Sequence, residues 1–132
     1  MKKTAAKTEG TNGNHQEFFT DGKLAAEGPL RDGKRHGRWT YYYRSGGRKA
    51  SGDFVEGKMD GTWEWWREDG KLLQTGVFIK DVQTGRWTRY HENGVVADER
   101  EFRDGKMTGE WKVFDESGGI KQHKVYKAKK TK

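Results

Sequence analysis

The chain has 132 residues, of which 30% are apolar, 36% charged and 13% aromatic, with a formal net charge of +7 and no cysteine. The lack of cysteine excludes a disulfide framework, a thiolate zinc site and a cysteine nucleophile. Such a low apolar content is typical of disordered chains, but those chains are poor in aromatic residues. The arrangement of the aromatic residues therefore decides whether this chain folds.

Tryptophan recurs every 24 residues along most of the chain, at Trp39, Trp63, Trp87 and Trp111. Glycine keeps the same period at two other places: Gly13, Gly37, Gly61, Gly85 and Gly109, and Gly22, Gly46, Gly70, Gly94 and Gly118. A fixed period of this length is typical of one small supersecondary unit that is copied and stacked. The sequence therefore predicts five 24-residue frames: 13–36, 37–60, 61–84, 85–108 and 109–132.

The residues before the first frame, 1–12, are polar, and we expect them to form a disordered tail. The chain starts with basic residues, as secretory signal peptides do, but Lys7 and Glu9 interrupt the apolar segment that should follow. No stretch approaches the ~20 apolar residues of a membrane-spanning helix. We therefore expect a cytoplasmic protein without a transmembrane segment.

Within a frame, the pattern predicts two strands and two turns. Residues 37–43 and 48–55 carry the aromatic and β-branched side chains that favour strands. Ser45 and Gly46 lie between them, and such dipeptides tolerate the positive φ angles of tight turns. Helices are not expected because glycine recurs too often. The predicted fold is all-β, an elongated antiparallel β-meander of about ten strands built from five tandem β-hairpins.

Aromatic residues that recur with the frame are expected to form the structural core. Apart from the four tryptophans, they are Tyr42, Trp66, Tyr90 and Phe114 in one column and Phe54, Phe78 and Phe102 in another. The tryptophans should lie in a row over glycines of neighbouring strands, which leave room for the rings. Trp39 and Tyr42 have an odd separation, so they share a face of the sheet only if a bulge intervenes.

Residues 33–39, GKRHGRW, and residues 57–63, GKMDGTW, resemble the G-K-x-x-G-x-W core of the bacterial variant of MORN repeats. The resemblance extends over residues 13–132. It implies consecutive β-hairpins in one extended sheet and a scaffold or tether role, and bacterial proteins of this kind are often assigned as antitoxin or immunity proteins. Single positions depart from the pattern: His15 in the tryptophan column, Asp81 and Lys129 in a turn-glycine column, and Arg100 and Lys124 in a strand-glycine column.

Several aromatic and basic residues break the columns, so the repeat itself does not require them. They fall into two sets of equivalent positions in successive frames. Tyr, Trp and Arg are enriched at the energetic centres of protein interfaces. Local variation in sheet packing is the alternative explanation. The predicted partner-binding patch consists of Phe19, Tyr41, Tyr43, Trp65, Arg67 and Arg89.

Positive charge is concentrated at the two ends of the chain, and residues 124–132 form a basic C-terminal end. This end is either a contact for anionic lipid at a membrane surface or a lysine-protected edge that blocks strand pairing with other molecules. A further alternative is single-stranded nucleic acid, bound by Tyr41 and Trp65 together with basic residues of the second frame. Those basic residues are Arg38, Arg44, Arg48 and Lys49.

Patterns that carry catalysis or bind metals are not found in the sequence. The four histidines, His15, His36, His91 and His123, lack metal-ligand spacing, and no serine lies in a G-x-S-x-G motif. We therefore expect no catalytic residue, no metal and no cofactor. The sequence predicts a non-catalytic protein-binding repeat scaffold, with a protein as its first expected partner, anionic lipid as the second and nucleic acid as the third.

Overall fold

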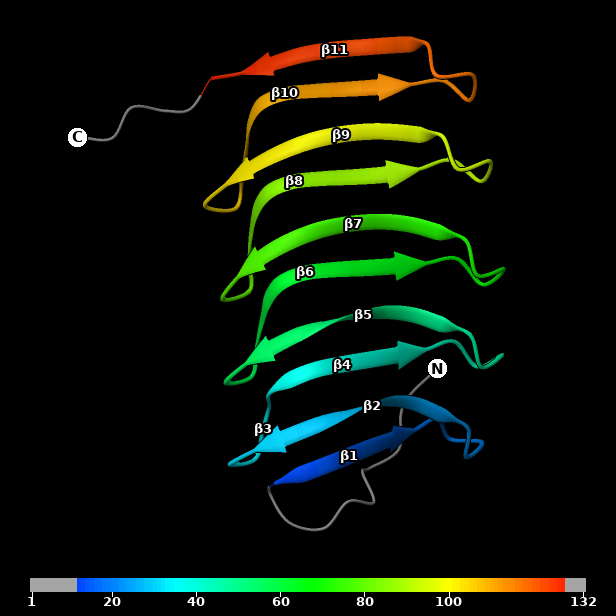
Figure 1. The fold of residues 1–132 in the computed structure, drawn as a ribbon, viewed down its shortest axis with the longest axis vertical. Coiled ribbons are helices and arrows are strands. Elements are labelled where there is room, and N and C mark those ends of the chain that lie inside the picture. Colours follow the sequence, from blue (N-terminus) through cyan, green and yellow to red (C-terminus); the bar gives the residue numbers. More distant parts are fainter. Residues whose placement is uncertain (1–11, 128–132) are drawn as a thin grey trace, which may run out of the picture.

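The computed structural model describes residues 12–127. They form one open antiparallel sheet, and they contain no helix. Figure 1 shows the strands stacked in chain order along the long axis of the molecule. This confirms the predicted all-β meander. The strands are β1 (Gly13–Phe18), β2 (Leu24–Arg31), β3 (Lys34–Arg35), β4 (Gly37–Tyr42), β5 (Arg48–Val55), β6 (Lys58–Trp66), β7 (Leu72–Ile79), β8 (Val82–Tyr90), β9 (Val96–Arg103), β10 (Lys106–Phe114) and β11 (Ile120–Tyr126).

The strand count exceeds the expected ten because β3 is separated from β4. Strand β3 pairs with β2 and lies off the main path of the sheet. In later repeats the equivalent residues belong to the single strands β6, β8 and β10, which bend sharply near their start (Figure 1). Gly61 stands at this bend in β6 with a φ of 77°, a left-handed conformation that glycine adopts without a Cβ penalty.

Tight turns connect the strands in the two ways that the sequence predicts. In the first turn of the second frame, Tyr43 N–H donates to the Gly47 carbonyl at 2.8 Å, and Gly46 has a φ of 101°. The second kind of turn places glycine in the left-handed region in most frames, but Asp81 stands there with a φ of 72°. Its carboxylate accepts a hydrogen bond from the Met59 N–H at 2.7 Å. This bond to the preceding repeat helps to offset the strain that a non-glycine residue carries there.

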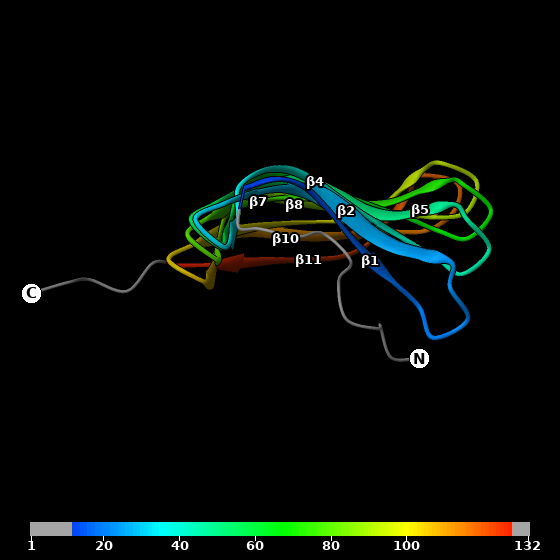
Figure 2. The same ribbon diagram turned by 90° about the horizontal axis from the view of Figure 1, so that it is seen from below.

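The sheet is one arched layer, and no second layer of the described residues covers either face (Figure 2). Trp39 pairs with Gly52 and Tyr41 pairs with Ala50, so these four side-chain positions share one face. The register shift after Tyr41 adds a residue to β5 and leaves the alternation of β4 intact. Tyr42 therefore lies on the opposite face from Trp39. We call the face of the tryptophan column the aromatic face, and the other one the polar face.

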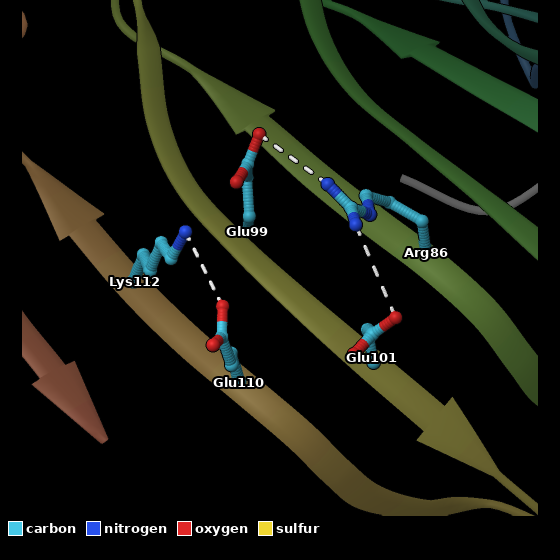
Figure 3. Close-up of a pocket in the computed structure, with 5 residues that line it drawn as sticks. All are labelled: Arg86, Glu99, Glu101, Glu110 and Lys112. Atoms are coloured by element: carbon cyan, nitrogen blue, oxygen red, sulfur yellow. Dashed lines mark ion pairs between the residues drawn. The ribbon is translucent and has the colours of Figure 1, made fainter. Parts of the chain in front are cut away.

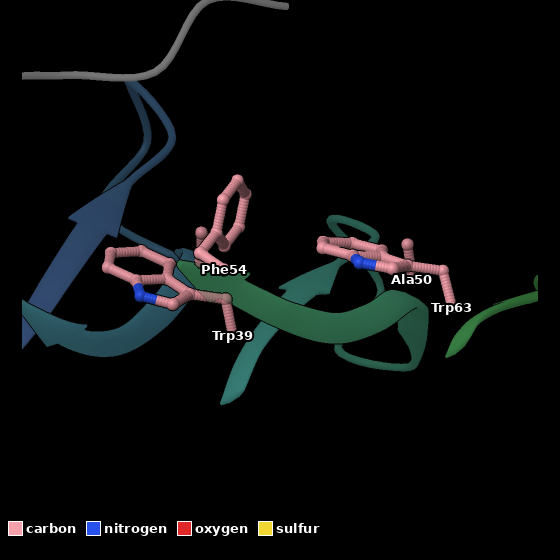
Figure 4. Packing of buried hydrophobic residues seen from close by; sticks show 5 residues of the cluster. Trp39, Ala50, Phe54 and Trp63 are labelled. Atoms are coloured by element: carbon pink, nitrogen blue, oxygen red, sulfur yellow. The ribbon is translucent and has the colours of Figure 1, made fainter. Parts of the chain in front are cut away.

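Tryptophans of the aromatic face lie flat over glycines of the preceding strand. A Cβ built on Gly28, Gly52 or Gly76 would stand 2.4, 2.1 or 2.3 Å from an indole ring atom, so only glycine fits there. The rings above them belong to Trp39, Trp63 and Trp87, which are 0, 1 and 3% exposed. In Figure 4 the Phe54 ring stands edge-on between the indoles of Trp39 and Trp63. Burial in this single-layer sheet thus comes from rings that cover backbone.

The second aromatic column, on the polar face, is held by charged neighbours. Trp66 is 8% exposed, and the Arg48 guanidinium lies 4.1 Å from the centre of its ring. The Tyr42 hydroxyl donates to Glu27 at 2.6 Å. Burial, reinforced by this bond to a carboxylate, raises the pKa of Tyr42 to about 12. Tyr90 and Phe114 of the same column are half-buried.

Two predictions about the ends fall partly outside the described residues. Of the predicted disordered tail, residues 1–12, only Asn12 is described, and its side chain accepts a hydrogen bond from the Asp32 N–H at 3.1 Å. Of the basic end, residues 124–132, the structure describes 124–127. In the described part of the chain, no helical segment is long and apolar enough to traverse a bilayer.

Candidate partner-binding surface

A continuous ladder of rings crosses the aromatic face. Neighbouring ring centres are 5.5 to 6.4 Å apart and the planes are tilted by 35 to 47°. Edge-to-face contacts with Phe54, Phe78 and Phe102 flank the ladder on one side. Such tilted and edge-to-face pairs stabilise beyond the area they bury. In order, the ladder contains His15, Trp39, Tyr41, Trp63, Trp65 and Trp87.

Three residues of the predicted patch come together on this face. Tyr41 and Trp65 fill the spaces between the repeating tryptophans, and both are half-buried, with one side of the ring row open to solvent. Burial raises the pKa of Tyr41. Arg89 occupies the next equivalent position on β8 and is exposed. Tyr41, Trp65 and Arg89 thus lie on one face of the sheet in successive repeats, and the two rings also pack against the core.

The other three predicted residues lie at the hairpin ends of the strands. The Tyr43 hydroxyl donates to the Trp66 carbonyl at 2.7 Å, and Arg67 Nη2 donates to the Tyr90 carbonyl at 2.9 Å. Each bond reaches 23 residues ahead, into the next repeat. Phe19 has no polar group for such a bond. We call these bonds inter-repeat bonds. They give Tyr43 and Arg67 a structural role, because each bond ties one repeat to the next.

Sequence reasoning did not foresee the inter-repeat bonds. His91 continues the series, because its Nε2 donates to the Phe114 carbonyl at 2.8 Å. A signal was present, since Tyr, Arg and His are the long polar side chains that can span to a neighbouring strand. The sequence shows that these residues occupy equivalent positions in the frame, but it does not show that their side chains bond to a carbonyl 23 residues ahead.

The first end of the ladder is closed by charged residues of the first frame. The Arg35 guanidinium lies 4.5 Å from the centre of the Trp39 ring and forms an ion pair with Glu17. The His15 ring takes the place of a tryptophan and stacks 5.8 Å from Trp39. These groups complete the burial of Trp39, as capping repeats do in other arrays.

The polar face carries paired charges. Arg86 lies 3.6 Å from Glu99 and 3.9 Å from Glu101, and Lys112 lies 3.2 Å from Glu110 (Figure 3). The hollow between these side chains measures about 40 Å³. Exposed ion pairs of this kind contribute little to stability. Because these two cations face three carboxylates, the hollow carries no excess of positive charge for a ligand.

A metal site needs several ligand side chains held close together. Among residues 12–127, no three histidine or carboxylate side chains gather as metal ligands would. The lowered pKa values belong to exposed turn residues. The Arg44 guanidinium lowers the pKa of Asp21, and a hydrogen bond from the Ser117 hydroxyl lowers the pKa of Asp115.

One sheet of consecutive hairpins, with aromatic rings stacked at a fixed period, defines a β-hairpin repeat protein. Residues 59–80, 83–104 and 107–128 match the MORN repeat variant family, and together they make up half of the chain. The chain belongs to this family, as its resemblance implied. The matches begin 24 residues apart, in agreement with the period of the tryptophans. No curated protein matches the chain.

Proposed function

We propose that the protein is a non-catalytic scaffold that binds a protein partner on its aromatic face. The observation that carries the proposal is that the rings of Tyr41 and Trp65 are half-buried between fully buried tryptophans, on a face that no second layer of residues 12–127 covers. Tyr and Trp side chains are enriched at protein interfaces, so partly covered rings in a row along one face support a binding role. The rings are held by neighbours on both sides, so binding would cost little side-chain entropy.

Tyr41 and Trp65 are the proposed centre of the contact, and Arg89 is its polar margin. The rings of Tyr41 and Trp65 present an edge or face to solvent while their inner sides touch the tryptophan column. Anchors of this kind, well packed behind and open in front, dominate the free energy of many interfaces. Tyr43, Arg67 and Phe19 then contribute through the stability of the hairpin ends.

The absence of catalysis is part of the same proposal. On the polar face, Arg38 pairs with Asp53, Arg86 with Glu99 and Lys112 with Glu110, and all six side chains are at least partly exposed to solvent. A catalytic carboxylate or histidine usually has a pKa shifted by burial or by a close partner in a cleft. Two larger hollows, of about 310 and 320 Å³, lie around β1 and β2 and are open to solvent, unlike an enclosed cleft.

Within the scaffold role, an antitoxin or immunity protein in the cytoplasm is the finer proposal. It derives from the family, whose bacterial members are often assigned to that role. Co-expression with the product of the adjacent reading frame tests it. Growth should be rescued by the wild-type chain, and a toxic product that this chain fails to neutralise would contradict it.

Binding to an anionic membrane surface is a second candidate, supported by strand β11. Its residues are almost all exposed, and Lys121 and Lys124 lie on it, with Lys127 directly after it. Co-sedimentation with phosphatidylglycerol vesicles tests this candidate. Nucleic acid ranks third because the arginines of the second frame are engaged, Arg44 with Asp21 and Arg48 with Trp66.

Site-specific photo-crosslinking tests the protein-binding proposal without removing a ring from the core. Benzoylphenylalanine would replace Tyr41 in one variant and Thr62, an exposed residue of the polar face, in the control. In the native cell we expect one discrete protein adduct from position 41 and none from position 62. If neither position gives an adduct, or both give the same one, the aromatic face is not the binding surface.

A further inference from the structure

At one strand inside the array, the residue expected beneath the tryptophan column is not glycine. Gly28, Gly52 and Gly76 each lie under an indole ring, but the equivalent residue on β9 is Arg100. Strand β9 is followed by β10 and β11, so this departure is not at an edge of the sheet. An end cap therefore does not explain it.

The next tryptophan, Trp111, is held differently from the three before it. The indole N–H groups of Trp39 and Trp63 donate to the carbonyls of Pro29 and Asp53, ten residues earlier, at 2.8 and 3.1 Å. Trp87 makes the same kind of bond to Val77. The Nε1 of Trp111 is buried and has no acceptor within the described residues. Trp111 is also only half-buried as a whole, unlike the three before it.

Two more buried polar atoms lack a hydrogen bond at the same place. They are Asp98 Oδ1 and Arg100 Nε, which lie 3.7 Å apart, too far for a good hydrogen bond. Asp98 and Arg100 point to the same face of β9, and the repeat frame places Trp111 beside Arg100. Buried polar atoms of folded proteins nearly always have hydrogen-bond partners, so these three atoms mark a place where the regular packing of the repeat is interrupted.

The charges around these atoms favour an anion. Arg89 pairs with Asp98 across the strands, and Lys124 pairs with Trp111, so both lie on the aromatic face. With Arg100, they give three cations against the single carboxylate of Asp98. We call the group of Arg89, Asp98, Arg100, Trp111 and Lys124 the cationic end of the aromatic face. It adjoins the ring ladder, because Trp87 pairs with Arg100.

We propose that the cationic end binds a carboxylate side chain from an extended acidic segment of a protein partner. The exposed side chains of Arg89 and Lys124 would pair with the carboxylate, and Arg100, whose side chain is 25% exposed, adds positive charge beside it. Apolar residues of the same segment would lie on the rings of Trp65 and Trp87. This inference rests on the proposed function and adds the chemistry of the partner. A peptide fits better than a lipid surface because donors and an apolar ring row lie side by side on one face.

Titration of the indole N–H signals tests the proposal. The chain has six tryptophans, so Trp111 can be assigned in a ¹⁵N–¹H spectrum with a Trp111→Phe variant. The probe is the blocked peptide acetyl-Leu-Glu-Leu-Glu-Leu-amide, and the control peptide has Gln in place of Glu. We expect saturable movement of the Trp111 signal with the acidic peptide and none with the Gln peptide.

Three variants locate the effect. Arg89→Glu should weaken binding of the acidic peptide about tenfold or more, the scale of one charge-assisted bond. Arg103→Glu makes the same charge change on an exposed arginine at the end of β9, and we expect a much smaller effect. Arg100→Gly restores the repeat glycine, so the Trp111 ring should pack over it as the Trp39, Trp63 and Trp87 rings pack over theirs. That variant should be more stable than wild type and should no longer respond to the peptide.

The outcomes separate this inference from the scaffold proposal. An unmoved Trp111 signal, an equal shift with the Gln peptide, or an equal loss in Arg89→Glu and Arg103→Glu would overturn the inference. A shift with phosphatidylglycerol vesicles but not with the peptide would replace it with a lipid site. A crosslinked adduct from position 41 alongside an unmoved Trp111 would refute the cationic end only. Loss of that adduct would refute the scaffold proposal itself.

Discussion

At the scale of single residues, this sheet depends on glycine opposite tryptophan. A sheet with one layer has no facing layer to cover its apolar side chains. Large rings that lie flat over backbone solve this problem, and they fit only where the neighbour has no side chain. Gly52 under Trp63 is the tightest case, with a built Cβ 2.1 Å from the ring.

Replacing Gly52 with alanine should therefore destabilise the fold by about 3 kcal/mol, because overpacking forces the ring or the strand to shift. Gly47→Ala is the matched control, since its Cβ would meet nothing nearer than 3.9 Å. Urea unfolding followed by tryptophan fluorescence measures both. Equal changes in the two variants would contradict the role given to Gly52.

Tyr42 makes a prediction about high pH. Its pKa is raised to about 12 in the folded chain, so the unfolded chain loses this proton first as the pH rises. Stability supplied by this group is complete below pH ~10 and falls between pH ~10 and ~12. Spectroscopic titration of tyrosinate in wild type and Tyr42→Phe should isolate one late-ionising tyrosine. Glu27→Gln should lower its pKa partway, since burial is the larger cause, and an unchanged curve would contradict the assignment.

Sequence predicted the tryptophan and glycine columns because their spacing is regular. It could not separate the tasks of Tyr41 and Tyr43, which are the same residue type two positions apart. Tyr41 enters the ring ladder, and Tyr43 bonds to the next repeat. Only the register of the strands and the position of the turn decide between these environments.

At the scale of strands and hairpins, the inter-repeat bonds supplement the backbone ladder. Tyr43→Phe removes one such hydroxyl while keeping the ring, and it should cost about 1 kcal/mol, because the Trp66 carbonyl loses its donor. Tyr126→Phe is the control, since no hydrogen bond of its hydroxyl is found within residues 12–127. Thermal unfolding compares the two. An effect of Tyr43→Phe no larger than that of Tyr126→Phe would mean that the bond contributes nothing.

Hairpins were predictable because each frame alternates strand-forming segments with glycine-containing turns. The bend at Gly61 and its equivalents was not predicted, although the glycines themselves were recognised. A periodic glycine is consistent with a turn, a bulge or a bend, and its φ angle distinguishes them only in the structure. The separation of β3 from β4 was not predicted for the same reason, because it depends on the backbone conformation at such a glycine.

At the scale of the whole molecule, each repeat is too small to bury its rings alone, and the array gains stability from contacts between neighbours. The fold could be predicted from the period, since stacking identical units leaves few other arrangements. The binding surface could be predicted only in part. Equivalent positions in the frame suggested Tyr41, Trp65 and Arg89 as the proposed contact, but the buried atoms of Asp98, Arg100 and Trp111 that lack a hydrogen bond depend on three-dimensional packing.

Hydrogen exchange of the indole N–H groups tests most directly whether tryptophans that pack over glycine and donate to a backbone carbonyl hold the array together. We predict slow exchange at Trp39, Trp63 and Trp87, whose N–H groups are bonded to carbonyls, and faster exchange at Trp111. In Arg100→Gly, Trp111 should become slow as well. Equally slow exchange at Trp111 in the wild-type chain, or fast exchange at the other three, would contradict this account.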